Sequence, residues 1–176
     1  MNMETYVINF YGGPGVGKST TASGVFNNLK ETTDLKCEYI TEYAKELTYA
    51  SNPAIENQLL VSGIQWERMR HCIGKVDVII CDSPIMTGAV YTDIPYFKFI
   101  LLHLHNNTKS FNFVLNRTKE YKQYGRSQSK DEAINKDNLI ENLLKEMHIQ
   151  YTNIETGVDS DIATVKYNLR LKGYNV

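Results

Sequence analysis

The chain has 176 residues, of which 42% are hydrophobic and 22% charged, and its formal net charge is −1. These values indicate one globular domain with a sizeable core, and they exclude a whole-chain attraction to nucleic acid or to an anionic membrane. We expect a cytoplasmic protein, because no apolar run approaches the roughly 20 residues of a membrane span and residues 1–4 do not begin a signal peptide.

The most specific stretch runs from Gly12 to Ser19 and reads Gly-Gly-Pro-Gly-Val-Gly-Lys-Ser. It fills every fixed position of the phosphate-binding pattern G-x-x-x-x-G-K-[ST]. A β-branched and aromatic run predicts a buried strand over 6–11, and apolar spacing predicts a helix over 19–30. In this context the glycines turn backbone N–H groups toward a phosphate, and the helix N-terminus adds partial positive charge. The stretch therefore predicts a nucleoside triphosphate site.

Two side chains of this loop have expected roles in triphosphate binding. Lys18 would reach the β- and γ-phosphates, and the Ser19 hydroxyl would bind Mg²⁺. The residues predicted to bind the nucleotide are Gly12, Gly13, Pro14, Gly15, Val16, Gly17, Lys18, Ser19 and Thr20.

An alternating run over 35–40 predicts a second strand, and Glu42 follows it. Ligands of open parallel sheets bind beyond the carboxyl ends of the strands, so Glu42 is expected near the phosphate loop. The residues alone leave open a solvated glutamate in a loop or first helical turn.

After Pro53, residues 55–73 predict one long helix. Its expected core stripe consists of Ile55, Leu59, Ser62, Trp66, Met69 and Ile73. A second stripe holds Gln58, Gln65 and Arg68, whose amides and guanidinium could read a base edge and an anionic group. A solvated polar face is the alternative for this second stripe.

The most strand-like run, residues 76–81, delivers Asp82 at its C-terminal end. P-loop proteins present the carboxylate that holds Mg²⁺ at the end of such an apolar strand. A helix cap is the alternative, but the upstream phosphate loop favours the metal role. The predicted metal ligands are therefore Ser19 and Asp82.

Five further elements complete the pattern: a helix opened by Pro95 with Phe97, Ile100, Leu101 and Leu104 on one side, a strand at 111–115, an amphipathic helix at 131–148, a strand at 149–154 and a helix at 159–171. The alternation of strand and helix predicts an α/β fold, in which a five-stranded parallel sheet carries helices on both faces. We expect a single domain over residues 1–176.

A basic segment follows the fourth strand, at about 116–130. In a protein with a triphosphate site it suggests a lid that closes over the phosphates. Its arginines, Arg117 and Arg126, would neutralise charge on the transferring phosphoryl group. A solvated basic loop is the alternative.

The order of these motifs resembles small-molecule P-loop kinases, especially the AAA-like group related to the nicotinamide riboside kinase domain, in which phage proteins look very similar. The resemblance covers nearly the whole chain. It rests on the phosphate loop, Thr41-Glu42-Tyr43-Ala44-Lys45, Gln58 and Gln65, the strand that runs into Asp82-Ser83-Pro84, and Tyr124-Gly125-Arg126-x-Gln128. Such kinases place the donor base near Thr156-Gly157.

This resemblance implies a kinase that uses Mg-ATP. The γ-phosphoryl group would pass to a hydroxyl or phosphate of a nucleoside-like small molecule, such as a nucleoside, a nucleotide or nicotinamide riboside. The implied catalytic set is Lys18, Glu42, Asp82, Arg117 and Arg126, with Glu42 orienting the acceptor hydroxyl or taking its proton. The expected acceptor site holds Glu42, Gln58, Gln65, Arg68 and Tyr124.

Two positions depart from the resemblance. Better-known deoxynucleoside and thymidylate kinases carry arginine where Ser83 stands, and members of the resembling group usually carry arginine where Lys45 stands, or vary there. The resemblance therefore does not transfer a specific substrate, and Arg68 is a candidate replacement cation. Two other functions stay open: a kinase of hydroxymethylated bases in phage DNA, and a P-loop ATPase or nucleotide-dependent binding module without a small acceptor. A GTPase is disfavoured, since Asn135-Lys136-Asp137-Asn138 places Asp one position early for a guanine motif. Both a monomer and a homodimer remain open.

Overall fold

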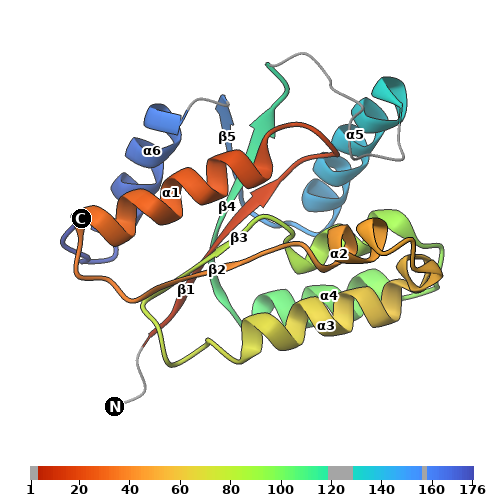
Figure 1. Cartoon of the computed structure of the whole chain (residues 1–176), viewed down its shortest axis with the longest axis horizontal. Coiled ribbons are helices and arrows are strands. Elements are labelled where there is room, and N and C mark those ends of the chain that lie inside the picture. Colours follow the sequence, from red (N-terminus) through yellow and green to blue (C-terminus); the bar gives the residue numbers. More distant parts are fainter. Residues whose placement is uncertain (1–3, 119–128, 156–157) are drawn as a thin grey trace.

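Five parallel strands form the centre of the fold, in the order β2-β3-β1-β4-β5 (Figure 1). The computed structural model describes residues 4–118, 129–155 and 158–176. The strands are β1 (Tyr6–Tyr11), β2 (Cys37–Ile40), β3 (Val78–Cys81), β4 (Lys109–Asn116) and β5 (Thr152–Glu155). The predicted five-stranded parallel sheet is confirmed.

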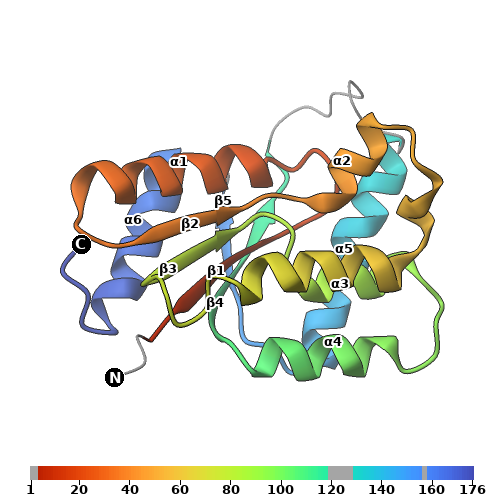
Figure 2. The ribbon, with the colours of Figure 1, turned by 60° about the horizontal axis from the view of Figure 1, so that its bottom comes forward.

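Helices cover both faces of this sheet (Figures 1 and 2). They are α1 (Lys18–Thr32), α2 (Tyr43–Tyr49), α3 (Gln58–Arg70), α4 (Phe97–Asn106), α5 (Lys130–Glu146) and α6 (Val158–Arg170). Two 3₁₀ helices are also present: η1 (Pro53–Glu56) precedes α3, and η2 (Ile85–Tyr91) follows β3. No helix within the described ranges is long and apolar enough to cross a membrane.

The central strand β1 explains how the two helical layers are joined. All six of its residues are buried, as expected for a strand covered on both faces. Ile8 and Phe10 pack with side chains of α1 and α6, whereas Tyr11 packs with residues of α4 and α5. Because side chains alternate along a strand, one short segment contributes to both cores.

The predicted helix over residues 55–73 is wrong at its N-terminal end. Asn57 has φ −84° and ψ 87°, and its side chain accepts a hydrogen bond from the Leu60 N–H (3.2 Å), so α3 begins only at Gln58. Of the predicted core stripe, Ser62 and Met69 are buried, whereas Leu59 is 53% exposed. The asparagine cap therefore shortens the helix that the apolar periodicity predicts.

Two other expectations also need correction. Ile100 on α4 is 55% exposed, although its helical neighbours Phe97 and Leu101 are buried. Neither α2 nor η2 was predicted from the sequence. Both follow strands at the carboxyl edge of the sheet, where they form walls around the phosphate loop.

We predict that Leu169→Ala lowers the free energy of unfolding by about 2–5 kcal/mol, because Leu169 on α6 is fully buried against the sheet. Leu171→Ala removes the same group two residues further on, where the side chain is 65% exposed, and serves as the matched control. That control should stay within about 0.5 kcal/mol of the parent protein. Urea denaturation measures both values, and equal losses would contradict the assigned core.

Candidate functional site

Glycines shape the loop between β1 and α1, because other residues rarely adopt the backbone conformations that this loop requires. Gly12, Gly15 and Gly17 have φ angles of 145°, 75° and 114°, which L-residues with a side chain rarely adopt. A Cβ on Gly12 would also lie only 2.7 Å from Cγ1 of Val16, whose side chain is buried beneath the loop. The backbone is thereby free to present its N–H groups to a ligand.

The helix that follows this loop begins without a side-chain cap. Gly17 is the N-cap of the 15-residue helix α1, and the first turn holds no acidic residue. The first N–H groups of a helix have no partner within the helix, and they carry partial positive charge. The N-terminus of α1 is therefore suited to bind an anion.

Lys18 lies at the centre of the charged groups. Its Nζ donates hydrogen bonds to the carbonyl oxygens of Gly12 (2.6 Å) and Gly13 (3.0 Å). Burial of the amino group lowers the pKa of Lys18, and the nearby carboxylates of Glu42, Asp82 and Asp137 act in the opposite direction. Three carboxylates thus surround the ammonium group that the sequence assigns to the triphosphate.

Asp82 and Ser19 have the chemistry of a magnesium site. Asp82 follows β3 and is 3% exposed, and its Oδ2 accepts a hydrogen bond from the Tyr39 hydroxyl (2.7 Å). Its Oδ1 is buried and has no hydrogen-bond partner among the described residues. Ser19, at the start of α1, also interacts with Tyr39. A buried carboxylate oxygen without a partner, beside a hydroxyl, fits a hard cation that prefers oxygen ligands.

Tyr39 is a site residue that sequence reasoning missed. Burial and the hydrogen bond to Asp82 raise the pKa of its phenol, while the Ser19 hydroxyl lowers it. Tyr39 reaches Asp82 because β2 lies beside β3 in the sheet, with Tyr39 opposite Ile80. The order of strands in the sheet was not part of the sequence prediction, so the only available signal was the position of Tyr39 near the end of a strand.

A cleft of about 640 Å³ opens beside the phosphate loop. Its walls come from the loop, α2, η1, α3 and η2. This volume and this setting are typical of a small-molecule site. The predicted site residues that line it are Pro14, Gly15, Gly17, Lys18, Ser19, Thr20, Glu42, Gln58 and Gln65.

Glu42 is the N-cap residue of α2 and lines this cleft. Burial raises the pKa of its carboxyl group, and Asp82 acts in the same direction, whereas the charges of Lys18 and Lys45 oppose them. A carboxylate with a raised pKa is a better proton acceptor near neutral pH than an exposed one. Glu42 can therefore orient a hydroxyl group and accept its proton.

The two predicted amide residues hold the walls of the cleft. Gln65 accepts a hydrogen bond from the Tyr43 N–H at Oε1 (3.1 Å), and its Nε2 donates to Cys81 Sγ (3.9 Å). Gln58 Nε2 donates to the Ile55 carbonyl oxygen (3.0 Å). These contacts join α2, η1 and β3 to α3, and reading of the acceptor by either amide stays a prediction.

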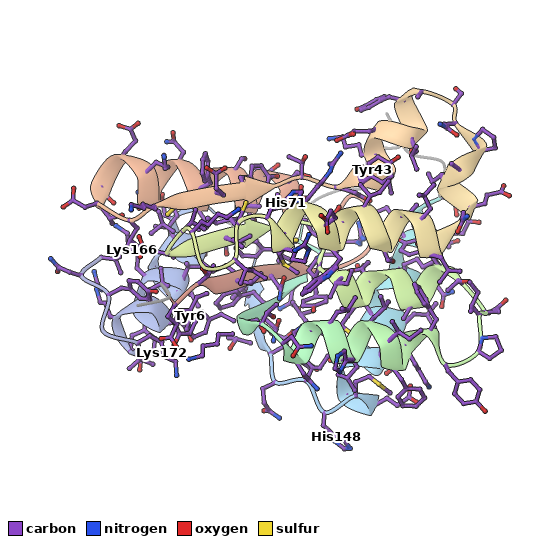
Figure 3. All side chains as sticks on the ribbon, turned by 90° about the horizontal axis from the view of Figure 1, so that it is seen from below. Tyr6, Tyr43, His71, His148, Lys166 and Lys172 are labelled. Atoms are coloured by element: carbon purple, nitrogen blue, oxygen red, sulfur yellow. The ribbon has the colours of Figure 1, made fainter. Side chains whose placement is uncertain are left out.

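The structure does not bring Arg68 together with the other predicted acceptor residues. Its guanidinium forms a bidentate ion pair with Glu46 (2.8 Å for each hydrogen bond) and lies 4.9 Å from the ring centroid of Tyr43. Tyr43 is labelled in Figure 3, at the start of α2. Arg68 does not belong to the described lining of the cleft, so its role as a replacement cation remains a prediction without a contact to support it.

Arg117 and Asp137 join the loop to α5. The Arg117 Nε donates to Asp137 Oδ2 (2.8 Å), and its Nη2 donates to the Pro14 carbonyl oxygen (2.9 Å). Asp137 Oδ1 accepts the Gly13 N–H (2.5 Å). A Cβ on Gly13 would lie 2.5 Å from the Ala133 carbonyl oxygen, so this glycine is required by close packing. Asp137 was missed as a site residue because its contacts depend on how α5 docks.

The neighbouring residue, Lys136, holds the opposite wall of the cleft. Its Nζ donates to the Val90 carbonyl oxygen (2.5 Å) and lies 4.4 Å from the ring centroid of Tyr91. Tyr91 lines the cleft. Consecutive residues of α5 therefore fix the phosphate loop and an aromatic part of the cleft wall.

Several predicted positions lie outside the described residues. They include Tyr124 and Arg126 of the basic segment and the Thr156-Gly157 pair after β5. Their roles as acceptor contact, lid arginine and donor-base region stay predictions.

The chain has detectable similarity to known proteins. A sequence model described as the AAA domain matches residues 7–160, whereas no curated protein matches the chain. A deoxyadenosine kinase from M. mycoides, solved with the products dCMP and a flexible dCDP, is 17% identical, with a TM-score of 0.55 over 93% of this chain and 98% of its own. A thymidylate kinase from Ehrlichia chaffeensis is 13% identical, with a TM-score of 0.62 over 94% and 99%. These structures share the P-loop α/β fold with the chain.

We predict that Glu42→Gln raises the free energy of unfolding at pH 7. The pKa of Glu42 is higher in the folded than in the unfolded protein, so folding loses stability as pH rises through the folded pKa and the buried carboxyl group ionises. Below pH 4, where the carboxyl is protonated in both states, the variant and the parent should converge.

Urea denaturation at about pH 3 and at pH 7 measures this difference, since the unfolded glutamate is protonated only below its pKa of about 4.3. Glu38→Gln is the matched control, because Glu38 is exposed on β2 and lies outside the cleft lining. A Glu42→Gln protein less stable than the parent at pH 7 would contradict the assigned environment of the carboxylate.

Proposed function

The chain belongs to the AAA domain family, and from this premise we propose that it is a kinase that transfers the γ-phosphoryl group of Mg-ATP to a hydroxyl of a nucleoside-like small molecule. One observation carries the proposal: the phosphate loop opens onto a cleft of about 640 Å³ that also contains the Glu42 carboxylate. A nucleotide-dependent switch needs the loop but has no need of a cleft with a proton acceptor in it.

Different residues of the site would bind the donor, hold the metal ion and orient the acceptor. The loop N–H groups and Lys18 would bind the triphosphate, and Ser19 and Asp82 would hold Mg²⁺, which when bound neutralises charge on the phosphate oxygens. The acceptor oxygen forms its bond to the γ-phosphorus as the bond to the bridging oxygen of ADP breaks. Glu42 orients the hydroxyl and receives its proton. Positioning and charge stabilisation supply most of the rate enhancement in such a reaction.

The charges of the cleft support a nucleoside as the acceptor over a nucleoside monophosphate. Among the described lining residues the cations are Lys18 and Lys45, and the anions are Glu42 and Glu56. With Lys18 assigned to the donor, Lys45 is the cation that remains among the described lining residues for a second phosphate. An uncharged nucleoside, or nicotinamide riboside with its positively charged ring, suits this balance better.

The cleft also offers surfaces for a planar ring. Tyr49 and Tyr91 line it together with Ile55 and Val61, and aromatic side chains pack well against flat heterocycles. The structurally similar M. mycoides protein is a deoxyadenosine kinase, which agrees with this class of acceptor, whereas the similar protein from Ehrlichia chaffeensis is a thymidylate kinase.

We predict that label from γ-labelled ATP with Mg²⁺ moves to a nucleoside. The panel holds nucleosides, nucleoside monophosphates, nicotinamide riboside and DNA with hydroxymethylated bases. Lys18→Ala should lose at least about 10²-fold in rate, since it removes a cation at the transferring phosphate. Label on the DNA alone would move the acceptor to a polymer. Label released only as free phosphate, whatever is added, would overturn the kinase proposal.

We predict further that Glu42→Gln lowers kcat by about 10²–10⁴-fold, the usual range for a positioned proton acceptor. Glu38→Gln is again the matched control and should keep the parent rate. The rate of the parent protein should fall in acid with a midpoint above the ordinary pKa of glutamate, since burial raises the pKa of Glu42. An unchanged kcat in Glu42→Gln would remove the carboxylate from the reaction.

A further inference from the structure

The Tyr39 side chain reaches the proposed metal site from a neighbouring strand. Tyr39 lies on β2, which pairs with β3 in parallel register. Its ring packs against Phe26 of α1, with ring centroids 6.0 Å apart. Its hydroxyl donates a hydrogen bond of 2.7 Å to Asp82 Oδ2. The ring is thus fixed by packing, and the hydroxyl is directed at the carboxylate.

The two oxygens of Asp82 have different surroundings. Oδ2 is taken by the phenol, whereas Oδ1 is buried and has no hydrogen-bond partner among the described residues. An unsatisfied carboxylate oxygen in a buried position is unfavourable unless a ligand completes it. The Ser19 hydroxyl, the other predicted metal ligand, lies near enough to lower the pKa of the phenol. The Tyr39 side chain is therefore bonded to one of the two groups that would bind the ion and lies near the other.

We propose that Tyr39 is a positioning residue for the divalent cation: its hydroxyl fixes the Asp82 carboxylate so that Oδ1 remains available to the metal ion. The proposal rests on the metal site of the proposed function. Residues that hydrogen-bond to metal-binding carboxylates fix their orientation, and their loss typically reduces metal affinity by about 10–100-fold. Tyr39 supplies such a contact from outside the phosphate loop and outside β3.

Tyr39→Phe tests the proposal, because it keeps the ring and its packing on Phe26 and removes only the hydroxyl. The affinity for Mn²⁺ in the presence of ADP should fall by about 10–100-fold. Electron paramagnetic resonance of the free ion measures this affinity. Binding of ADP in the presence of EDTA should stay unchanged. A tyrosine with a purely structural role would alter neither of these, or would alter both together through lost stability.

Tyr6→Phe is the matched control. The Tyr6 hydroxyl also contacts a carboxylate oxygen, Glu4 Oε2 at 3.4 Å, but β1 starts at Tyr6 and reaches the phosphate loop only after Tyr11. Figure 3 labels Tyr6 at the start of β1 and Tyr43 at the start of α2, on opposite sides of the view. The control should bind Mn²⁺ as tightly as the parent protein.

A double-mutant cycle removes the remaining ambiguity. In an Asp82→Asn background, Tyr39→Phe should cost no further Mn²⁺ affinity, since the hydroxyl acts through Asp82. Additive losses, or a Tyr39→Phe protein with parental Mn²⁺ binding, would overturn the positioning role.

Failure of the kinase proposal is distinguishable, because the Mn²⁺ measurement needs no acceptor and no turnover. If the parent protein binds Mn²⁺ with ADP but transfers no label, only the kinase proposal is contradicted. If the parent protein binds no Mn²⁺ with ADP, both proposals are contradicted.

Discussion

The site depends on the contacts of one partly buried cation, the ammonium group of Lys18. It bonds to the carbonyl oxygens of Gly12 and Gly13, and the carboxylates of Glu42 and Asp82 lie close enough to act on its pKa. In a desolvated position each of these charges would be unfavourable alone, and the ammonium group offsets one carboxylate but not both. A triphosphate that enters brings further negative charge, which the loop N–H groups and a bound cation would offset. Binding of a triphosphate would therefore depend on a cation that binds with it.

The residues that sequence reasoning found are those whose role depends on nearby sequence. The phosphate loop could be predicted because glycine spacing and the following helix act within one stretch of chain, and Asp82 because it ends an apolar strand. Tyr39 and Asp137 act through contacts that only the folded chain creates. The first needs β2 beside β3, and the second needs α5 docked on Gly13. Chemistry local in sequence was thus predictable, and the residues that support it were not.

The fold was predictable to the same extent. Five strands and their parallel arrangement follow from apolar runs that alternate with helical patterns. The start of α3 does not, since a polar side chain on Asn57 ends the periodic pattern by capping a new helix. The buried face of α3 includes Val61, Ser62, Gln65 and Met69, of which Ser62 and Met69 belong to the predicted stripe, whereas Leu59 is left in solvent.

The inward position of Gln65 ties the two carboxylates together. Its amide oxygen holds the backbone of Tyr43, the residue after Glu42, and its amide nitrogen reaches the sulfur of Cys81, the residue before Asp82. A single buried side chain therefore links the backbone next to Glu42 to the residue before Asp82. In-line phosphoryl transfer, as proposed for this site, requires the acceptor oxygen and the bound phosphate to meet in one geometry. In that proposal the packing of Gln65 between α2 and β3 would serve the reaction through the position of its neighbours.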